Sequence, residues 1–132
     1  MAQILLVEDQ PNQRQLYAEE LTDCGYDVKV ASNGPDALEM FKQCHPQLVV
    51  MDVLLPGMNG IEVMERMLAM EPQLPIIVHS AYTSPSHDFI TWFARAYVVK
   101  SGDLQELKNQ VQKALSGTPV VETQDRSGLV SA

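Results

Sequence analysis

Five polar side chains capable of chemistry stand in this chain directly after short apolar runs. They are the carboxylates of Glu8, Asp9 and Asp52, the hydroxyl of Ser80 and the amine of Lys100. Asp52 is the most unusual, because it lies inside the apolar stretch VVMDVLLPGMNG at residues 49–60. An ionised carboxylate among valines and leucines costs several kcal/mol unless something compensates for its charge. We therefore expect Asp52 to have a partner.

The apolar runs alternate with amphipathic segments along most of the chain. Uninterrupted runs such as Ile4 to Val7 are typical of strands buried on both faces, and strands are expected at residues 4–7, 26–31, 47–51, 76–79 and 97–99. Helices are expected between Pro11 and Gly25, between Pro35 and Pro46, and over about 60–70, 86–95 and 104–116. Leu16, Tyr17 and Leu21 are expected to form the apolar face of the first helix.

Strand and helix alternate five times, which predicts a parallel sheet with helices on both faces. Right-handed connections leave few topologies. The common one of this size is the α/β, flavodoxin-like, doubly wound fold, a five-stranded parallel sheet of order 2-1-3-4-5 with five helices. The 132 residues suit one domain, expected over residues 1–117. The polar, non-periodic residues 118–132 are interpreted as a C-terminal tail.

The carboxyl ends of strands 1 and 3 flank the point at which such a sheet binds its ligands. Glu8, Asp9 and Asp52 are therefore expected close together. Two carboxylates about 4 Å apart repel by roughly 4 kcal/mol at an effective dielectric constant near 20. Such a cluster must either take up a proton or bind a cation. A site made of oxygen ligands favours Mg²⁺ or Mn²⁺ over zinc.

Lys100 and Ser80 indicate a second ligand at the same edge. An ammonium and a hydroxyl opposite a metal-bound carboxylate suit an incoming phosphoryl group, for which Asp52 would be the nucleophile. The structural alternative is that Lys100 only forms an ion pair with an acid at the edge of the sheet. His79, within strand 4, is interpreted as a buried structural histidine rather than as a ligand.

The charge and composition of the chain exclude some classes of function. Nine basic and seventeen acidic side chains give a net charge of −8, which does not suit a surface for duplex nucleic acid. No apolar run approaches the length of a membrane span. Cys24 and Cys44 are interpreted as reduced thiols, with a disulfide as the alternative. We expect a cytoplasmic protein without nucleic-acid or membrane partners.

Four segments resemble the motifs of response-regulator receiver domains of two-component signalling, over about residues 2–117. They are ILLVEDQPNQR, LVVMDVLLPGMNGIEV, PIIVHSAY and AYVVKS, and the second is the most specific. The resemblance implies that Asp52 accepts a phosphoryl group from a histidine kinase or a histidine phosphotransfer protein. It implies a phosphoacceptor rather than an enzyme, with slow self-dephosphorylation left open.

The resemblance also implies roles for individual residues. Asp9, Asp52 and the backbone carbonyl of Leu54 would bind Mg²⁺, with Glu8 acting through water. The switch pair would be Ser80 and Tyr97, and the phosphate-binding lysine would be Lys100. The family usually has proline after this lysine, often through a cis bond, where this chain has Ser101. A non-proline cis bond costs about 3 to 4 kcal/mol, so a trans bond is expected.

Apolar residues lie almost all round the segment DFITWFARAY, which favours a partner surface. By implication the chain is a stand-alone receiver whose helix 4, strand 5 and helix 5 bind a target protein or a second copy. Trp92 is the main candidate contact, and the alternative is that it folds over the neighbouring loop. The resemblance implies that the residues two positions beyond the phosphoacceptor and two beyond the switch hydroxyl, here Leu54 and Tyr82, border the path of the attacking water. Neither carries an amide or carboxylate to orient that water, so a long-lived phosphorylated form is expected.

Two alternative hypotheses are a binding module and an enzyme or cofactor protein, the latter either a phosphatase or a flavodoxin. A phosphorylation-independent binding module on the same fold would be favoured by a missing acid or lysine, and neither is missing. A haloacid dehalogenase phosphatase needs a second Asp where this chain has MDVLL. A flavodoxin needs a loop rich in glycine and hydroxyl groups where this chain has EDQPNQ.

Overall fold

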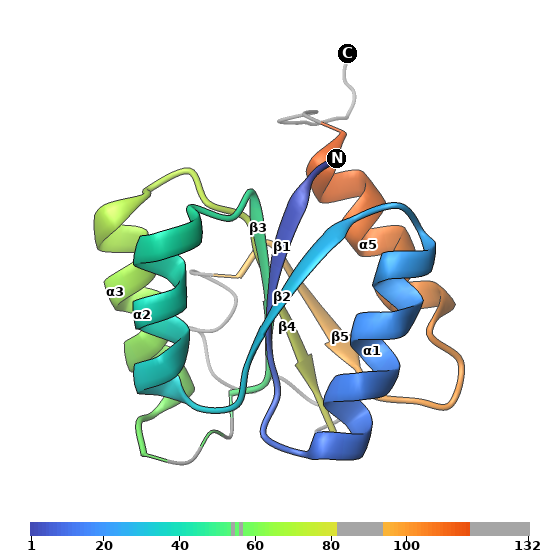
Figure 1. Cartoon of the computed structure of the whole chain (residues 1–132), viewed down its shortest axis with the longest axis horizontal. Coiled ribbons are helices and arrows are strands. Elements are labelled where there is room, and N and C mark those ends of the chain that lie inside the picture. Colours follow the sequence, from blue (N-terminus) through green and yellow to red (C-terminus); the bar gives the residue numbers. More distant parts are fainter. Residues whose placement is uncertain (54, 56, 82–93, 117–132) are drawn as a thin grey trace.

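A central sheet with helices on both sides forms the frame of the molecule (Figure 1). The computed structural model describes residues 1–53, 55, 57–81 and 94–116. The elements in chain order are β1 (Gln3–Val7), α1 (Pro11–Asp23), β2 (Asp27–Ala31), α2 (Gly34–Cys44), β3 (Leu48–Met51), α3 (Gly60–Met70), β4 (Ile76–Ser80), β5 (Ala96–Val99) and α5 (Gln105–Leu115).

The five strands are parallel and lie in the order β2-β1-β3-β4-β5, which confirms the predicted topology. Helices α2 and α3 cover one face of the sheet, and α1 and α5 cover the other (Figure 1). Because all strands run in the same direction, their carboxyl ends meet at one edge, the lower edge in Figure 1. This edge carries the side chains that the sequence singles out.

The sheet has a hydrophobic core on each face, because successive side chains of a strand point to opposite faces. In β1, Leu5 and Val7 pack toward α2 and α3, whereas Ile4 and Leu6 pack toward α1 and α5. All four are at most 1% exposed. Burial on both faces explains why the central strands read as continuous apolar runs.

Proline and glycine set the ends of α1, as expected. Pro11 is the first residue of α1, where the missing N–H costs no helical hydrogen bond. Gly25 follows the end of the helix with φ +99°, a left-handed conformation that glycine adopts without strain. Tyr17 and Leu21 are buried as predicted, but Leu16 is 46% exposed. Leu16 was wrongly expected on the buried face, because it adjoins that face without facing the sheet.

The next two helices have side-chain caps at their starts. Asn33 Oδ1 accepts a hydrogen bond from the backbone N–H of Asp36 at 2.8 Å, and Asn59 Oδ1 accepts one from Ile61 at 2.8 Å. Such caps satisfy N–H groups that have no partner within the helix. The α3 range of residues 60–70 agrees with the prediction.

Some predicted features lie outside the described residues. These are residues 86–93 of the expected fourth helix, Gly117 and the tail at 118–132; Ala94 and Arg95 are described and are not helical. Cys24 and Cys44 are free thiols. Within the described ranges, every helix is too short or too polar to be a membrane span.

Candidate phosphoacceptor site

The ammonium of Lys100 lies between two buried carboxylates at the carboxyl edge of the sheet. Its Nζ is 2.8 Å from Oε1 of Glu8 and 2.8 Å from Oδ2 of Asp52. Glu8 is 2% exposed and Asp52 is 7% exposed, while the Lys100 side chain is 13% exposed. Lys100 is therefore one partner of Asp52 in this structure, the ion pair that the sequence offered as the alternative to a bound cation.

The backbone brings the two acids together. Val7 of β1 pairs in register with Met51 of β3, so the residues that follow them, Glu8 and Asp52, leave the sheet side by side. The N–H of Asp52 donates to the carbonyl of Val7 at 3.3 Å, which continues this pairing beyond β3. Glu8 and Asp52 were expected to lie close together because β1 and β3 should be neighbours at the switch point, and the structure shows that they are neighbours.

Lys100 reaches these acids from the end of β5. Its N–H donates to the carbonyl of Ser80 at 2.7 Å, which anchors the backbone of Lys100 to β4. Among the described residues no peptide bond is cis, so the Lys100–Ser101 bond is trans. The position of Lys100 thus follows from the β4–β5 pairing.

The carboxylates keep Lys100 charged. Burial acts to lower the pKa of this amine, but the hydrogen bonds and negative charges of Asp52 and Glu8 outweigh it, so the pKa is raised. An opposite charge within a few ångströms favours the ionised form of a buried group. Lys100 therefore presents a positive charge directly beside Asp52.

Arg14 and Gln10 hold the loop between β1 and α1. Arg14 Nη1 donates to the carbonyl of Glu8 at 3.0 Å and to that of Asp9 at 3.5 Å, and the Gln10 N–H donates to Oε2 of Glu8 at 3.1 Å. Asp9 is half-buried. In the described part of the chain, no three His, Cys, Asp or Glu residues are grouped closely enough to hold a metal ion. Glu8, Asp9 and Asp52, which were expected close together, do not form such a group here.

The donor set nevertheless suits a divalent cation. Glu8 and Asp52 carry two negative charges, and Lys100 supplies one positive charge. Asp9 adds a further carboxylate next to Glu8. A buried excess of negative charge is costly, and hard cations such as Mg²⁺ prefer carboxylate oxygens. Leu54, whose carbonyl was predicted as a ligand, lies outside the described residues.

Ser80 and Tyr97 lie on adjacent strands near the same edge. Ser80 is fully buried at the end of β4, and Tyr97 of β5 is half-buried and pairs with Val78. Tyr97 packs against the core on the α2 and α3 side. Since side chains alternate along a strand, Ser80 shares the face of Val78 and hence that of Tyr97.

His79 is a structural residue of the layer below the site. It is 3% exposed and its ring contacts that of Tyr17 edge-on, with centroids 4.8 Å apart. Burial, assisted by the charge of Lys100 and opposed by that of Asp52, lowers the pKa of His79 to about 4. The ring is therefore neutral at pH 7 and adds no second positive charge near Lys100. This agrees with the interpretation of His79 as a buried structural histidine.

Sequence reasoning missed one contact of the site. The Oε1 atom of Gln13 lies 2.9 Å from Nζ of Lys100. The spacing in the sequence could have indicated it. Gln13 stands four residues before Tyr17, which was expected on the buried face of the first helix, and residues spaced by four lie on the same face.

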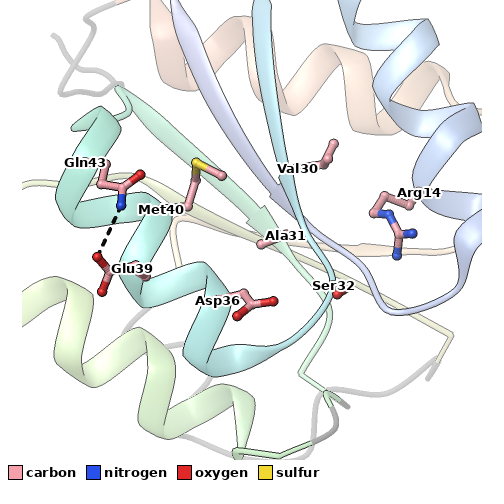
Figure 2. A pocket seen from close by; sticks show the side chains of 8 residues that line it. All are labelled: Arg14, Val30, Ala31, Ser32, Asp36, Glu39, Met40 and Gln43. Carbon is pink, nitrogen blue, oxygen red and sulfur yellow. Dashed lines mark hydrogen bonds between the residues drawn. The ribbon is translucent and has the colours of Figure 1, made fainter.

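A hollow of about 400 Å³ lies beside this site without containing it. Figure 2 shows Arg14 on one side of β2, with Asp36 and Glu39 of α2 on the other. None of the acids at the sheet edge lines it, and its mixture of charges selects no single ligand.

Known proteins match this chain in sequence and in fold. The response regulator receiver domain family matches residues 4–112. This chain belongs to that family. The receiver domain resembles the solved response regulator TrrA from Thermotoga maritima in complex with Mg²⁺-BeF, with 40% identity, a TM-score of 0.82, and coverage of 87% of this chain and 100% of TrrA.

Two further comparisons extend the finding. A second structure, of TrrA in complex with the histidine kinase ThkA, aligns with a TM-score of 0.81 and 40% identity, covering 87% of this receiver and 99% of the matched chain. The regulatory protein AtoC of Escherichia coli is 35% identical over 114 residues, 85% of this chain and 25% of AtoC. The chain thus spans about a quarter of AtoC, and 47% to 59% of further curated relatives such as the response regulator ArlR of Staphylococcus aureus.

Proposed function

We propose that this receiver accepts a phosphoryl group on Asp52 from a phosphohistidine of a histidine kinase or phosphotransfer protein. The contact between Asp52 Oδ2 and Lys100 Nζ, at 2.8 Å, carries the proposal. It pairs a buried carboxylate at the end of a central strand with an amine whose raised pKa keeps it charged. The complex of TrrA with a histidine kinase supports the class of donor.

The chemistry is a displacement at phosphorus. A carboxylate oxygen of Asp52 forms a bond to phosphorus as the bond from phosphorus to the histidine nitrogen breaks, and the leaving imidazole takes up a proton. Lys100 neutralises a phosphoryl oxygen, and the hydroxyl of Ser80 donates to another. The receiver is a phosphoacceptor, and slow hydrolysis of the acyl phosphate is its only proposed turnover.

Glu8, Asp9 and Asp52 would hold Mg²⁺, together with the backbone carbonyl of Leu54 and with Glu8 acting through water. When bound, the cation supplies positive charge to the phosphoryl oxygens during transfer. The complex of TrrA with Mg²⁺-BeF supports this cofactor. We expect Mn²⁺, which accepts the same oxygen ligands, to substitute for it.

We also propose that output is a protein–protein contact, with a target or a second copy, at the face that includes β5 and α5. Ser80 and Tyr97 would report phosphorylation to this face as the switch pair, by shifting a population of two conformations. Trp92, expected on the same face, and Tyr82, expected to shield the phosphoryl group with Leu54, lie outside the described residues. The net charge of −8 argues against nucleic acid as the partner, and we place the protein in the cytoplasm.

The test is incubation with acetyl phosphate and Mg²⁺ followed by intact mass measurement. The wild-type chain should gain one phosphoryl group, and the isosteric Asp52→Asn variant should gain none. Labelling of the variant at the wild-type level would reject Asp52 as the acceptor. A chain that gains no phosphoryl group from any donor would instead be a phosphorylation-independent binding module.

A further inference from the structure

Lys100 has a third partner that is not an acid. Its ammonium has three N–H donors, and these face Oε1 of Glu8 at 2.8 Å, Oδ2 of Asp52 at 2.8 Å and the carboxamide oxygen of Gln13 at 2.9 Å. Since three acceptors match three donors, a phosphoryl oxygen that binds Lys100 has to replace one of them.

Gln13 reaches Lys100 because of where α1 begins. Pro11 starts the helix directly after the acidic loop, so Gln13 lies in the first turn, next to the sheet edge. Tyr17 and Leu21, four and eight residues later, are buried against the sheet, and residues spaced by four share one helix face. Gln13 is therefore the member of this inward face nearest to the carboxylates.

Of the three acceptors, Gln13 binds the ammonium most weakly. A hydrogen bond between an ammonium and a carboxylate gains from two charges, whereas the carboxamide oxygen is neutral. Loss of the ammonium from Glu8 or Asp52 would also take the neighbouring positive charge away from a buried carboxylate, which is costly. While Asp52 is still ionised, an incoming anionic phosphoryl oxygen should consequently displace Gln13 before either carboxylate.

We propose that Gln13 is an exchangeable positioning ligand of Lys100. It holds the ammonium beside Asp52 in the unphosphorylated protein and gives up its place when a phosphoryl oxygen arrives. This inference rests on the proposed phosphorylation of Asp52. It assigns to α1 a direct part in the site, through a side chain that the resemblance to the family does not include among the site residues.

Two substitutions at Gln13 should act in opposite directions on the rate of phosphorylation by acetyl phosphate. Gln13→Leu removes the competing acceptor, so the variant should react at least as fast as wild type. Gln13→Glu adds a third carboxylate that Lys100 holds firmly and that repels the donor, so the rate should fall about tenfold. Gln15→Glu is the matched control for charge. Gln15 is exposed and bonds Glu19 at 3.2 Å, so this variant should keep the wild-type rate.

The NMR signal of the Lys100 ammonium gives a readout that does not depend on phosphorylation. It should shift in unphosphorylated Gln13→Leu, while the signal of Lys108, which bonds Glu20 at 2.6 Å, should stay unchanged. An unmoved Lys100 signal, or a Gln13→Leu rate that falls as far as the Gln13→Glu rate, overturns the inference and leaves the proposed function intact. If wild type is not phosphorylated at all, the proposed function fails and the inference fails with it.

Discussion

The Nζ atom of Lys100 lies 2.8 Å from Oδ2 of Asp52, although 48 positions separate the two residues in the sequence. Their strands are not neighbours, because β4 lies between β3 and β5. The long lysine side chain crosses this distance along the carboxyl edge of the sheet and also reaches Glu8. The positive charge that balances Glu8 and Asp52 therefore comes from a strand that is not adjacent to theirs, and its position depends on how the strands pack.

Replacement of Lys100 should destabilise the protein as well as impair phosphorylation. Lys100→Met keeps much of the apolar stem but leaves Glu8 and Asp52 without their cation. Removal of one partner from a buried ion pair costs about 3 to 5 kcal/mol, so urea denaturation at pH 7 should show a loss near the lower end of that range.

A double-mutant cycle checks the origin of this loss. Asp52→Asn in the Lys100→Met background removes one of the two negative charges that no longer have the lysine beside them, and should recover part of the lost free energy of unfolding. If the losses from the two substitutions simply add, the pair is not coupled in solution and the reason given for the instability is wrong.

The requirement for a divalent cation should depend on Asp9. Asp9→Asn removes one of the acids proposed to hold Mg²⁺, so the Mg²⁺ concentration for half-maximal phosphorylation should rise roughly tenfold or more. Asp23→Asn, with the same change of charge at the far end of α1, is the control and should behave as wild type. Equal Mg²⁺ dependence in all three proteins would place the cation elsewhere.

Stability should fall in mild acid because of His79. The pKa of this residue is lowered from 6.5 to about 4 by burial first and then by the charge of Lys100. Between pH 6.5 and 4 the unfolded chain therefore binds a proton at His79 that the folded chain does not. As a result, the free energy of unfolding decreases as the pH is lowered through that range. The contribution amounts to about 3 kcal/mol when fully lost.

A variant that does not titrate isolates this effect. His79→Val should be less stable than wild type at pH 7, because it loses the contact with Tyr17, but its stability should fall less steeply between pH 6.5 and 4. Urea denaturation at several pH values measures both slopes. Parallel slopes would show that His79 is protonated in the folded state as readily as in the unfolded chain.

The close approach of α3 to the loop after β3 depends on Gly60. A Cβ atom at this position would lie 2.6 Å from both the Cα and the carbonyl oxygen of Val53. Because these are backbone atoms, Gly60→Ala must displace the loop that follows Asp52, and a loss of about 1 to 3 kcal/mol is expected. Gly102→Ala is the control, since nothing lies within 4 Å of a Cβ there. Its thermal denaturation should match that of wild type, and a similar loss in both variants would refute the steric explanation.

Local patterns in the sequence were sufficient for the described strands, for α1, α2, α3 and α5, and for their order, whereas the fourth expected helix lies mostly outside the described residues. Apolar runs without alternation indicated β1, β3 and β4 as strands buried on both faces, and Pro11 and Gly60 marked the starts of α1 and α3. These signals are local because they depend on backbone conformation and on the period of side-chain burial. Handedness rules then reduced the topologies enough to place Glu8 and Asp52 at one edge.

The partners of each side chain at that edge could not be obtained in the same way. The sequence placed three acids near one another and predicted a cation among them, but not that Lys100 would lie between Glu8 and Asp52. Nor did it indicate that Gln13, 87 positions away, would bind the same ammonium. Such contacts depend on how α1 is set against the sheet and on the competition of one ammonium for several acceptors. Both are properties of packing between distant segments, and no pattern within a single segment encodes them.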